Sequence, residues 1–154
     1  MDGPMKDHEA LVMSMRADEL NVGDQPRVVL VDDDPETRAL LRSVLEDEGI
    51  AVVGAAGDGS EALEVISAVQ PDVVLMDLRM PGMGGFEATR RVKENHPDIQ
   101  VIILTFYEDL LGNRDPEEIG AFAYLVKGCS PRLMRDVIKY AWRHRIEELV
   151  TRSA

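Results

Sequence analysis

The stretch RVVLVDDDPETR, residues 27–38, decides the fold, because a strand that looks buried runs through three adjacent carboxylates into the start of a helix. The aliphatic run Val28–Val31 predicts a strand that is buried on both faces. Like charges about 4 Å apart repel by roughly 1 kcal/mol in water, and by more near a protein surface. We therefore expect Asp32, Asp33 and Asp34 either to meet a compensating cation or to have different roles.

The same kind of short aliphatic run recurs along the rest of the chain, and segments with helical spacing separate the runs. Five strands alternating with helices indicate an α/β fold, with a five-stranded parallel sheet covered by helices on both faces. The predicted strands are Val28–Val31, Val52–Ala55, Val73–Met76, Val101–Leu104 and Ala123–Val126, and the predicted helices are Thr37–Glu48, Ser60–Val69, Phe86–Asn95 and Pro131–Arg152.

Composition narrows the class of protein and its partners. The 154 residues suffice for one domain, and 45% hydrophobic with 30% charged residues is typical of a soluble globular protein. The formal net charge of −12 argues against nucleic acid or an anionic membrane surface as the main partner. No apolar run is long enough for a signal peptide or a membrane span, and a single cysteine suits a reducing compartment. We therefore expect a cytoplasmic protein that binds neither DNA nor membrane directly.

Polar side chains end four of the five predicted strands, and the carboxyl ends of parallel strands meet at one rim of the sheet. Three carboxylates with one ammonium remain net negative and call for a cation, and oxygen ligands of this kind suit Mg²⁺. A carboxylate beside Mg²⁺ and a lysine can attack a phosphoryl group, because both cations offset charge on the transferring oxygens. These strand-end residues are Asp32 and Asp33, Asp77, Thr105 and Lys127.

Residues 27–150 resemble the receiver domain of two-component response regulators, in the motifs VLVDDDP, DVVLMDLRMPGMGG, VIILT and GAFAYLVKG. The resemblance implies a flavodoxin-like, doubly wound fold with strand order 2-1-3-4-5. It also implies a phosphorylation-operated switch of a phosphorelay. The only chemistry of such a switch would be to accept a phosphoryl group and to lose it slowly by hydrolysis. The implied partners are a histidine kinase or phosphotransfer protein and a downstream protein target.

Matching the family's motifs gives each position an implied role in phosphorylation. Asp77 is the implied phosphoacceptor. Mg²⁺ would be bound by Asp33, by Asp77 and by the backbone carbonyl of Arg79, whereas Asp32 would act through a bound water. Lys127 would pair with Asp77 and later with the phosphoryl group.

The resemblance further implies two switch residues. Thr105 would move toward a phosphoryl oxygen, and Tyr124 would turn inward behind it. That movement would alter the face formed by the fourth helix, the fifth strand and the last helix, which a partner would read. The alternative for Tyr124 is an ordinary half-buried aromatic residue.

The chain departs from the family pattern in two places. Phe106 and Tyr107 stand where a small residue usually follows Thr105, so their bulk would slow phosphoryl entry or protect the product from water, unless both rings turn away. The segment YEDLLGNRDPEEIGAF, residues 107–122, contains Gly and Pro where the fourth helix belongs. We therefore predict a short, displaced or mobile fourth helix, in which Pro116 opens a brief turn.

Two residue pairs predict helix starts, and the rest of the chain suggests two extensions. Asp34 before Pro35, and Ser130 before Pro131, match a capping side chain followed by the residue favoured at the first helical position. We divide the chain into an N-terminal extension (1–25, partly helical), a receiver domain (26–143) and an extension of the last helix (144–154). The last extension would form a dimer contact or begin a linker, and a homodimer through the fourth helix, fifth strand and last helix is another arrangement.

Three alternative functions remain open at this stage. The chain would be a receiver-shaped interaction module that is never phosphorylated, or the regulatory domain of a longer protein. The third is a phosphatase with an aspartate nucleophile, which usually carries the pattern D-x-D-x-[TV] after its first strand. The corresponding position here is Glu36, which argues against the phosphatase.

Overall fold

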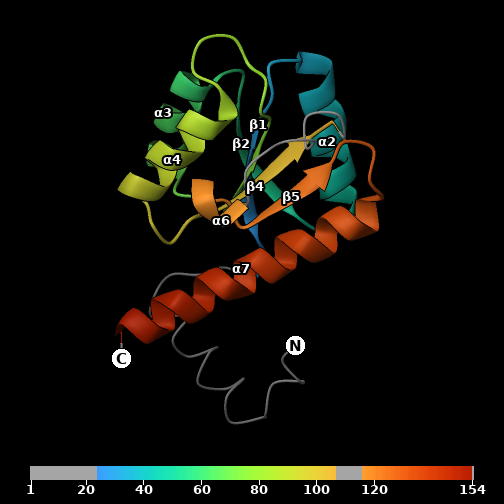
Figure 1. The fold of residues 1–154 in the computed structure, drawn as a ribbon. Helices are drawn as coiled ribbons and strands as arrows, with labels where there is room; N and C mark the ends of the chain where they lie inside the picture. Colours follow the sequence, from blue (N-terminus) through green and yellow to red (C-terminus); the bar gives the residue numbers. More distant parts are fainter. Residues whose placement is uncertain (1–23, 107–115, 154) are drawn as a thin grey trace.

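A computed structural model describes residues 24–106 and 116–153, which form a parallel five-stranded sheet between two layers of helices (Figure 1). The strand order, β2-β1-β3-β4-β5, confirms the predicted doubly wound fold. The strands are β1 (Arg27–Val31), β2 (Ala51–Ala56), β3 (Val73–Met76), β4 (Gln100–Thr105) and β5 (Ala123–Val126), and the helices are α2 (Pro35–Asp47), α3 (Gly59–Val69), α4 (Gly85–Asn95), α6 (Pro116–Ile119) and α7 (Pro131–Ser153).

Alternating side chains of the central strands fill two hydrophobic cores, one on each face of the sheet. One set packs under α3 and α4 and includes Val29, Val74 and Ile103. The other packs under α2 and α7 and includes Leu30, Leu75 and Ile102. Because both faces are covered, the central strands are continuous aliphatic runs, the pattern from which they were predicted.

Capping side chains begin two of the helices, as predicted. Asp34 has an extended backbone and its carboxylate accepts hydrogen bonds from the Glu36 N–H at 3.1 Å and the Thr37 hydroxyl at 2.7 Å. Pro35 is the first residue of α2. At the start of α7, the Ser130 hydroxyl accepts from the N–H of Leu133 at 3.1 Å. Asp34 therefore terminates the acidic triplet as a helix cap.

The second half of α7 packs across the amino end of the sheet. Arg145 pairs with Asp72 at 2.8 Å and with Asp98 at 2.9 Å. The backbone N–H of Arg27 donates to the other oxygen of Asp72 at 2.9 Å. Ile146 is also buried. Part of the segment assigned to an extension from the sequence thus packs against the domain, because its basic and aliphatic side chains find partners under the sheet.

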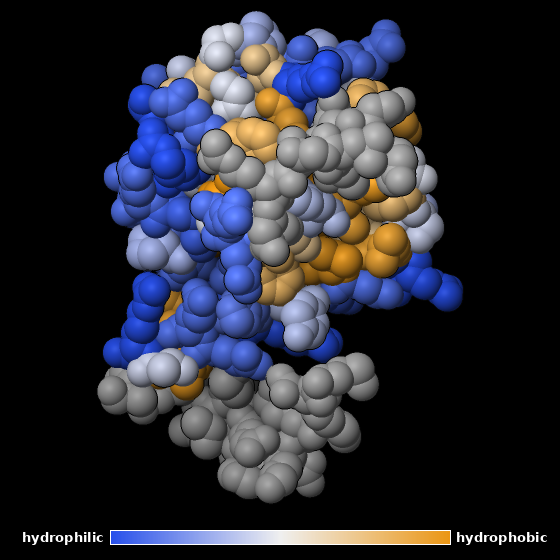
Figure 2. Space-filling view, in the orientation of Figure 1, coloured by the Kyte–Doolittle hydropathy of each residue, from blue (hydrophilic) through white to orange (hydrophobic). Residues whose placement is uncertain are grey.

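The segment predicted as a weak fourth helix is described only from Pro116 onward. Pro116 begins α6, a helix of four residues, so the expected brief turn at this proline is present. The remainder of the predicted fourth helix lies outside the described residues. Hydrophobic side chains gather on the neighbouring face formed by β5 and α7 (Figure 2). Of the helices in residues 24–106 and 116–153, none combines the length and the apolar character needed to cross a bilayer.

Candidate functional site

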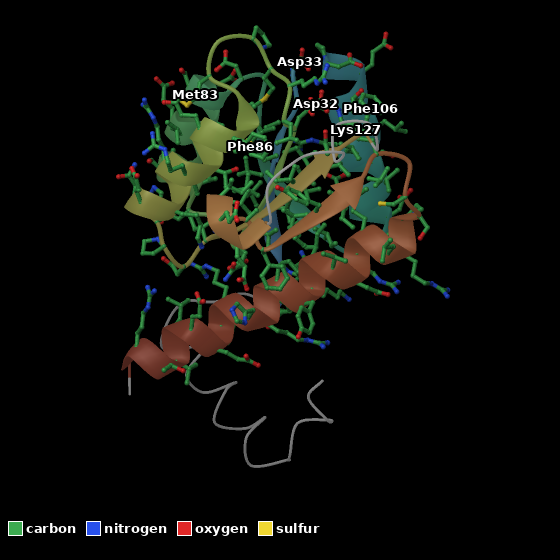
Figure 3. All side chains as sticks on the ribbon, viewed as in Figure 1. Asp32, Asp33, Met83, Phe86, Phe106 and Lys127 are labelled. Carbon is green, nitrogen blue, oxygen red and sulfur yellow. The ribbon has the colours of Figure 1, made fainter. Side chains whose placement is uncertain are left out.

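Three carboxylates from two strand ends meet at the carboxyl rim of the sheet. Figure 3 labels two of them, Asp32 and Asp33, near Lys127. Asp32, Asp33 and Asp77 each offer an oxygen, and these oxygens lie within 4.8 Å of one another. Parallel pairing places them there, because the Asp77 N–H donates to Val31 and the Asp32 N–H to Ala56. Asp32 and Asp77 are buried, whereas Asp33 is exposed. The sequence-predicted cluster is therefore formed.

Lys127 brings a single ammonium to these carboxylates from the end of β5. Its Nζ lies 2.8 Å from Oδ2 of Asp32 and 3.2 Å from Oδ2 of Asp77. The expected pairing with Asp77 is present, and the shorter contact is to Asp32. Because the cluster holds three carboxylates and this ammonium pairs with two of them, the cluster keeps an excess of negative charge at neutral pH.

Burial and charge shift the ionisation of the central pair in ways that follow from this geometry. Burial raises the pKa of Asp77 above its ordinary value, and the Asp32 carboxylate adds to that rise, while Lys127 and the Arg79 backbone N–H lower it by less. For Lys127, burial lowers the pKa, but contacts with Asp32 and Asp77 outweigh it, so the pKa lies above the ordinary value. Lys127 is therefore a fixed positive charge at neutral pH.

The donor set fits a hard divalent cation. All three side chains offer carboxylate oxygens, which Mg²⁺ prefers, and the exposed Asp33 leaves the cluster open to solvent. Oδ1 of Asp32 accepts a hydrogen bond from the Asp34 N–H at 2.9 Å, which fixes the orientation of that carboxylate. A cation bound here would offset the repulsion that one lysine leaves uncompensated.

Glycines allow the loop after Asp77 to pack closely against the Asp77 backbone and against the start of α3. A Cβ on Gly85 would overlap the backbone carbonyl of Asp77, and a Cβ on Gly59 would lie 2.6 Å from the carbonyl oxygen of Met83. The N–H of Gly59 donates to that same oxygen at 3.2 Å. The loop between β3 and α4 is therefore attached to the start of α3.

The structure places the two predicted switch residues on adjacent strands. Thr105 is fully buried at the end of β4, and its carbonyl accepts from the Lys127 N–H at 2.7 Å. Tyr124 is half-buried in β5, beside Ile103 of β4, and contacts the core under α3 and α4. Thr105 therefore lies at the carboxyl rim beside Lys127, and Tyr124 lies in the neighbouring strand.

The sequence left two positions open for the Phe106 ring, beside the acidic cluster or turned away from it, and the structure places the ring over Lys127. The centre of its ring lies 4.9 Å from Nζ of Lys127, and the side chain is 57% exposed. The ring therefore covers the ammonium from the solvent side, a cation–π contact. Tyr107 lies outside the described residues.

Sequence reasoning missed Arg38 and the close-packed glycines. The Arg38 guanidinium donates to the backbone carbonyl of Asp32 at 2.5 Å. Its position four residues after the cap, on the first turn of α2, was the available signal, because that turn faces the same rim. For Gly59 and Gly85 no local pattern in the sequence signals which backbone will approach.

Comparisons with known proteins identify the family of this chain. Residues 28–139 match the family profile described as the response regulator receiver domain. Response regulator GacA from Pseudomonas viridiflava is 40% identical over 114 residues, covering 73% of this chain and 53% of the relative. Response regulator UvrY from Escherichia coli K12 is 41% identical over 113 residues, covering 73% and 52%. The chain thus spans about half the length of these curated relatives.

Solved structures show the same fold. A CheY-like receiver domain protein from Methanospirillum hungatei superposes with a TM-score of 0.71 at 27% identity, covering 81% of this chain and 99% of that one. The response regulator TrrA from Thermotoga maritima, solved with Mg²⁺ and BeF, gives a TM-score of 0.68 at 29% identity, covering 76% and 99%. The second structure holds its magnesium and beryllofluoride in a protein of this fold.

Proposed function

This chain belongs to the response regulator receiver domain family, and on that premise we propose that it is a phosphorylation-operated switch whose phosphoacceptor is Asp77. The observation that carries the proposal is the cluster of three carboxylates within 4.8 Å, two of them paired with Lys127. Asp32 and Asp77 are both buried, and Asp77 opens the loop with Gly82, Gly84 and Gly85 that follows β3. A buried carboxylate beside a fixed ammonium is a suitable nucleophile for phosphorus.

In the proposed reaction, a carboxylate oxygen of Asp77 attacks the phosphorus of a phosphohistidine on a histidine kinase or phosphotransfer protein. The new O–P bond forms as the N–P bond of the donor breaks, and its electron pair returns to the imidazole nitrogen. Lys127, already 3.2 Å from Asp77, would then contact a phosphoryl oxygen. The Thr105 hydroxyl would donate to another oxygen of that group.

Asp33, Asp77 and the backbone carbonyl of Arg79 would bind Mg²⁺ directly, and Asp32 would contribute through a water. Their oxygen-only chemistry and close spacing support this assignment. When bound, the ion supplies positive charge that offsets the charge on the transferring phosphoryl oxygens. The same charge would allow a dianionic phosphoryl group to enter a rim that is otherwise net negative.

Phe106 would control access to the acceptor. Its exposed ring already covers Lys127, so donor and water must pass it to reach the phosphoryl site. We assign the same role to Tyr107 by its adjacent position. Slower entry and slower hydrolysis would follow together, because both use one route.

The readout would run through β5. Movement of Thr105 toward the phosphoryl group would free space into which Tyr124 turns, changing the face that the sequence analysis assigned to the fourth helix, the fifth strand and the last helix. A downstream protein, or a second copy of the chain, would bind one state of this surface better than the other. Phosphorylation would then act as a population shift between the two states.

The test is to incubate the protein with Mg²⁺ and acetyl phosphate and to measure its intact mass. The expected result is one added phosphoryl group per chain, lost on hydroxylamine treatment as an acyl phosphate should be. Asp77→Asn should add none, while Asp34→Asn, which changes a neighbouring carboxylate to an amide that also caps helices, should add one as the wild type does.

The other outcomes separate the alternatives. A folded wild type that gains no phosphoryl group, either from acetyl phosphate or from purified histidine kinases, would identify an interaction module that is never phosphorylated. Multiple turnover of a phosphorylated small molecule would instead identify a phosphatase.

A further inference from the structure

The guanidinium of Arg38 lies between two loops of the carboxyl rim, beside the backbone of the acidic cluster. Arg38 is the fourth residue of α2 and is half-buried. Its Nη1 donates a hydrogen bond to the backbone carbonyl of Asp32, directly after β1. The same nitrogen would lie 3.3 Å from a Cβ on Gly57, in the loop that follows β2. The absence of a side chain at Gly57 therefore leaves room for the guanidinium between the two loops.

Each polar group of Asp32 has a hydrogen-bond partner, and Arg38 supplies one of them. The Asp32 N–H donates to the carbonyl of Ala56 at 3.1 Å. Oδ1 accepts from the Asp34 N–H at 2.9 Å, and Oδ2 accepts from Lys127 at 2.8 Å. The backbone carbonyl accepts from the Arg38 guanidinium. Four separate groups thus fix the side chain and the backbone of Asp32.

The peptide bond between Asp32 and Asp33 connects Arg38 to the proposed metal site. The oxygen of this peptide accepts the hydrogen bond from Arg38, and its nitrogen belongs to Asp33. Asp33 is exposed, so the direction of its carboxylate depends mainly on the backbone that carries it. A planar peptide that is held at its oxygen has little freedom to rotate. The hydrogen bond from Arg38 therefore limits the directions in which Asp33 can project.

We propose that Arg38 is a positioning residue for the metal site, which sets the Mg²⁺ affinity by orienting the peptide that carries Asp33. The inference rests on the proposed function, because it takes the acidic cluster as a Mg²⁺ site. Arg38 would contact neither the ion nor the phosphoryl group. It would act through the backbone, as a group behind a metal ligand fixes the orientation of that ligand.

The charge of Arg38 acts on the ion in the opposite sense from its hydrogen bond. A guanidinium near the cluster repels Mg²⁺, so loss of the charge alone would tighten binding. Loss of the hydrogen bond would weaken binding, because Asp33 would sample directions away from the other carboxylates. We expect the hydrogen bond to dominate, since it joins a charged donor directly to a half-buried carbonyl. The repulsion acts across a rim that is open to solvent at Asp33 and is screened by salt.

The experiment titrates the unphosphorylated protein with magnesium chloride and measures binding by isothermal titration calorimetry. Arg38→Met removes the charge and the donors but keeps an unbranched stem, and it should raise the dissociation constant for Mg²⁺ roughly tenfold. Arg38→Lys keeps a charged donor on a shorter side chain and should give an intermediate value. The matched control is Arg42→Met, one turn further along α2, whose ion pair with Glu46 is solvent-exposed. That variant should bind Mg²⁺ as the wild type does.

Two further measurements separate orientation from a loss of fold. The amide spectrum of ¹⁵N,¹³C-labelled Arg38→Met protein should remain that of a folded domain. Without Mg²⁺, its largest shifts in this loop should be those of the Asp32 carbonyl and the Asp33 amide. Phosphorylation of this variant by acetyl phosphate should need roughly tenfold more Mg²⁺ for half of its maximal rate. The rate at saturating Mg²⁺ should equal that of the wild type.

The sign and the site of the effect decide the outcome. Arg38→Met protein that bound Mg²⁺ as tightly as the wild type, or more tightly, would overturn the inference, and so would an equal loss of affinity in Arg42→Met. A wild type that bound no Mg²⁺ would overturn both the inference and the proposed metal site. A wild type that bound Mg²⁺ with the expected dependence on Arg38 but accepted no phosphate would contradict the proposed phosphorylation alone.

Discussion

The two ends of the sheet each contain buried carboxylates beside a basic side chain, but charge is balanced at only one of them. At the amino end two guanidinium groups act on two carboxylates: Arg145 pairs with Asp72 and Asp98, and the charge of Arg27 also lowers the pKa of Asp72. The remaining oxygen of Asp72 accepts a hydrogen bond from the Arg27 N–H. At the carboxyl end, Lys127 is the one described residue whose charged group pairs with carboxylates of the acidic cluster. A paired network stabilises the fold, whereas an excess of like charge costs stability and leaves capacity to bind a cation.

The largest effect should come from removing one carboxylate of the unbalanced end. Asp33→Ala should abolish Mg²⁺-dependent phosphorylation, because a proposed direct ligand is lost. In the absence of Mg²⁺ the same variant should melt a few degrees higher than the wild type, since repulsion in the cluster falls. Acetyl phosphate labelling and thermal melting with and without Mg²⁺ measure both effects.

The neighbouring carboxylate provides the matched control. Asp34→Ala should lower the melting temperature by a few degrees through loss of the α2 cap and should leave phosphorylation unchanged. If folded Asp34→Ala protein lost phosphorylation, the assignment of Asp34 to helix capping and of Asp32 and Asp33 to the metal site would be wrong.

Breaking the balanced end should reduce stability and spare the chemistry. Arg145→Met leaves Asp72 buried without its basic partner, so the free energy of unfolding should fall by about 3 kcal/mol. Urea denaturation measures the loss. The control is Arg90→Ala, whose ion pairs on α4 are solvent-exposed and should matter by less than about 1 kcal/mol. Folded Arg145→Met protein that no longer accepted phosphate would show that the two ends are coupled.

A smaller effect is expected from the ring that covers the ammonium of the unbalanced end. Phe106→Ala should raise the rates of phosphorylation by acetyl phosphate and of dephosphorylation by roughly threefold to tenfold each, because one barrier limits both. Stopped-flow fluorescence or timed mass spectrometry measures the two rates. A change in only one of them would contradict a shared route, and Phe106→Leu, which keeps bulk without the ring face, separates steric cover from the cation–π contact.

The smallest expected effect is a pH dependence that differs in sign between Asp72 and Asp34. Burial raises the pKa of Asp72 above its ordinary value, although a hydrogen bond from the Arg27 N–H and the charges of Arg145 and Arg27 lower it by less. The native state therefore binds this proton more tightly than the unfolded chain. The resulting stability is fully present below about pH 3.8 and is lost as pH rises through the native pKa.

Asp34 should behave in the opposite way. Hydrogen bonds from the Thr37 hydroxyl and the Glu36 N–H hold its pKa below the ordinary value, so its contribution is present above about pH 3.8 and is lost at lower pH. Urea denaturation from pH 3 to 7 should thus show opposite slopes when Asp72→Asn and Asp34→Asn are each compared with the wild type. Slopes of the same sign would contradict the assigned causes.

The sequence predicted most of the scaffold because buried parallel strands have a distinctive pattern. The predicted bounds of β1, β3 and β5 agree with the structure to within one residue, since aliphatic runs end where polar side chains reach the rim. The strand-end residues Asp32, Asp77 and Lys127 were predicted to meet for the same reason. The helix caps at Asp34 and Ser130 could also be predicted from the sequence, because each precedes a proline.

What the sequence did not reveal depends on contacts between distant segments. The packing of Gly59 against Met83 joins two loops whose approach no local pattern encodes. The pairing of Arg145 with Asp72 spans 73 residues, and surface arginines are common on helices. The position of the Phe106 ring was likewise left open, because the alternatives differ only in a side-chain rotation.

Helix α7 begins four residues after Lys127 and continues without interruption past Arg145. A continuous helix of this kind fixes the position and direction of a group attached to its end, because each residue adds 1.5 Å of length and about 100° of rotation about the axis. Consider a fluorescent protein joined to the last turn of α7 by a rigid helical spacer. Its direction around the helix axis would depend on the number of residues in the spacer and would repeat after each full turn. Donor–acceptor energy transfer across such a series should oscillate with spacer length, and a phosphorylation-induced rotation of α7 would appear as a phase shift.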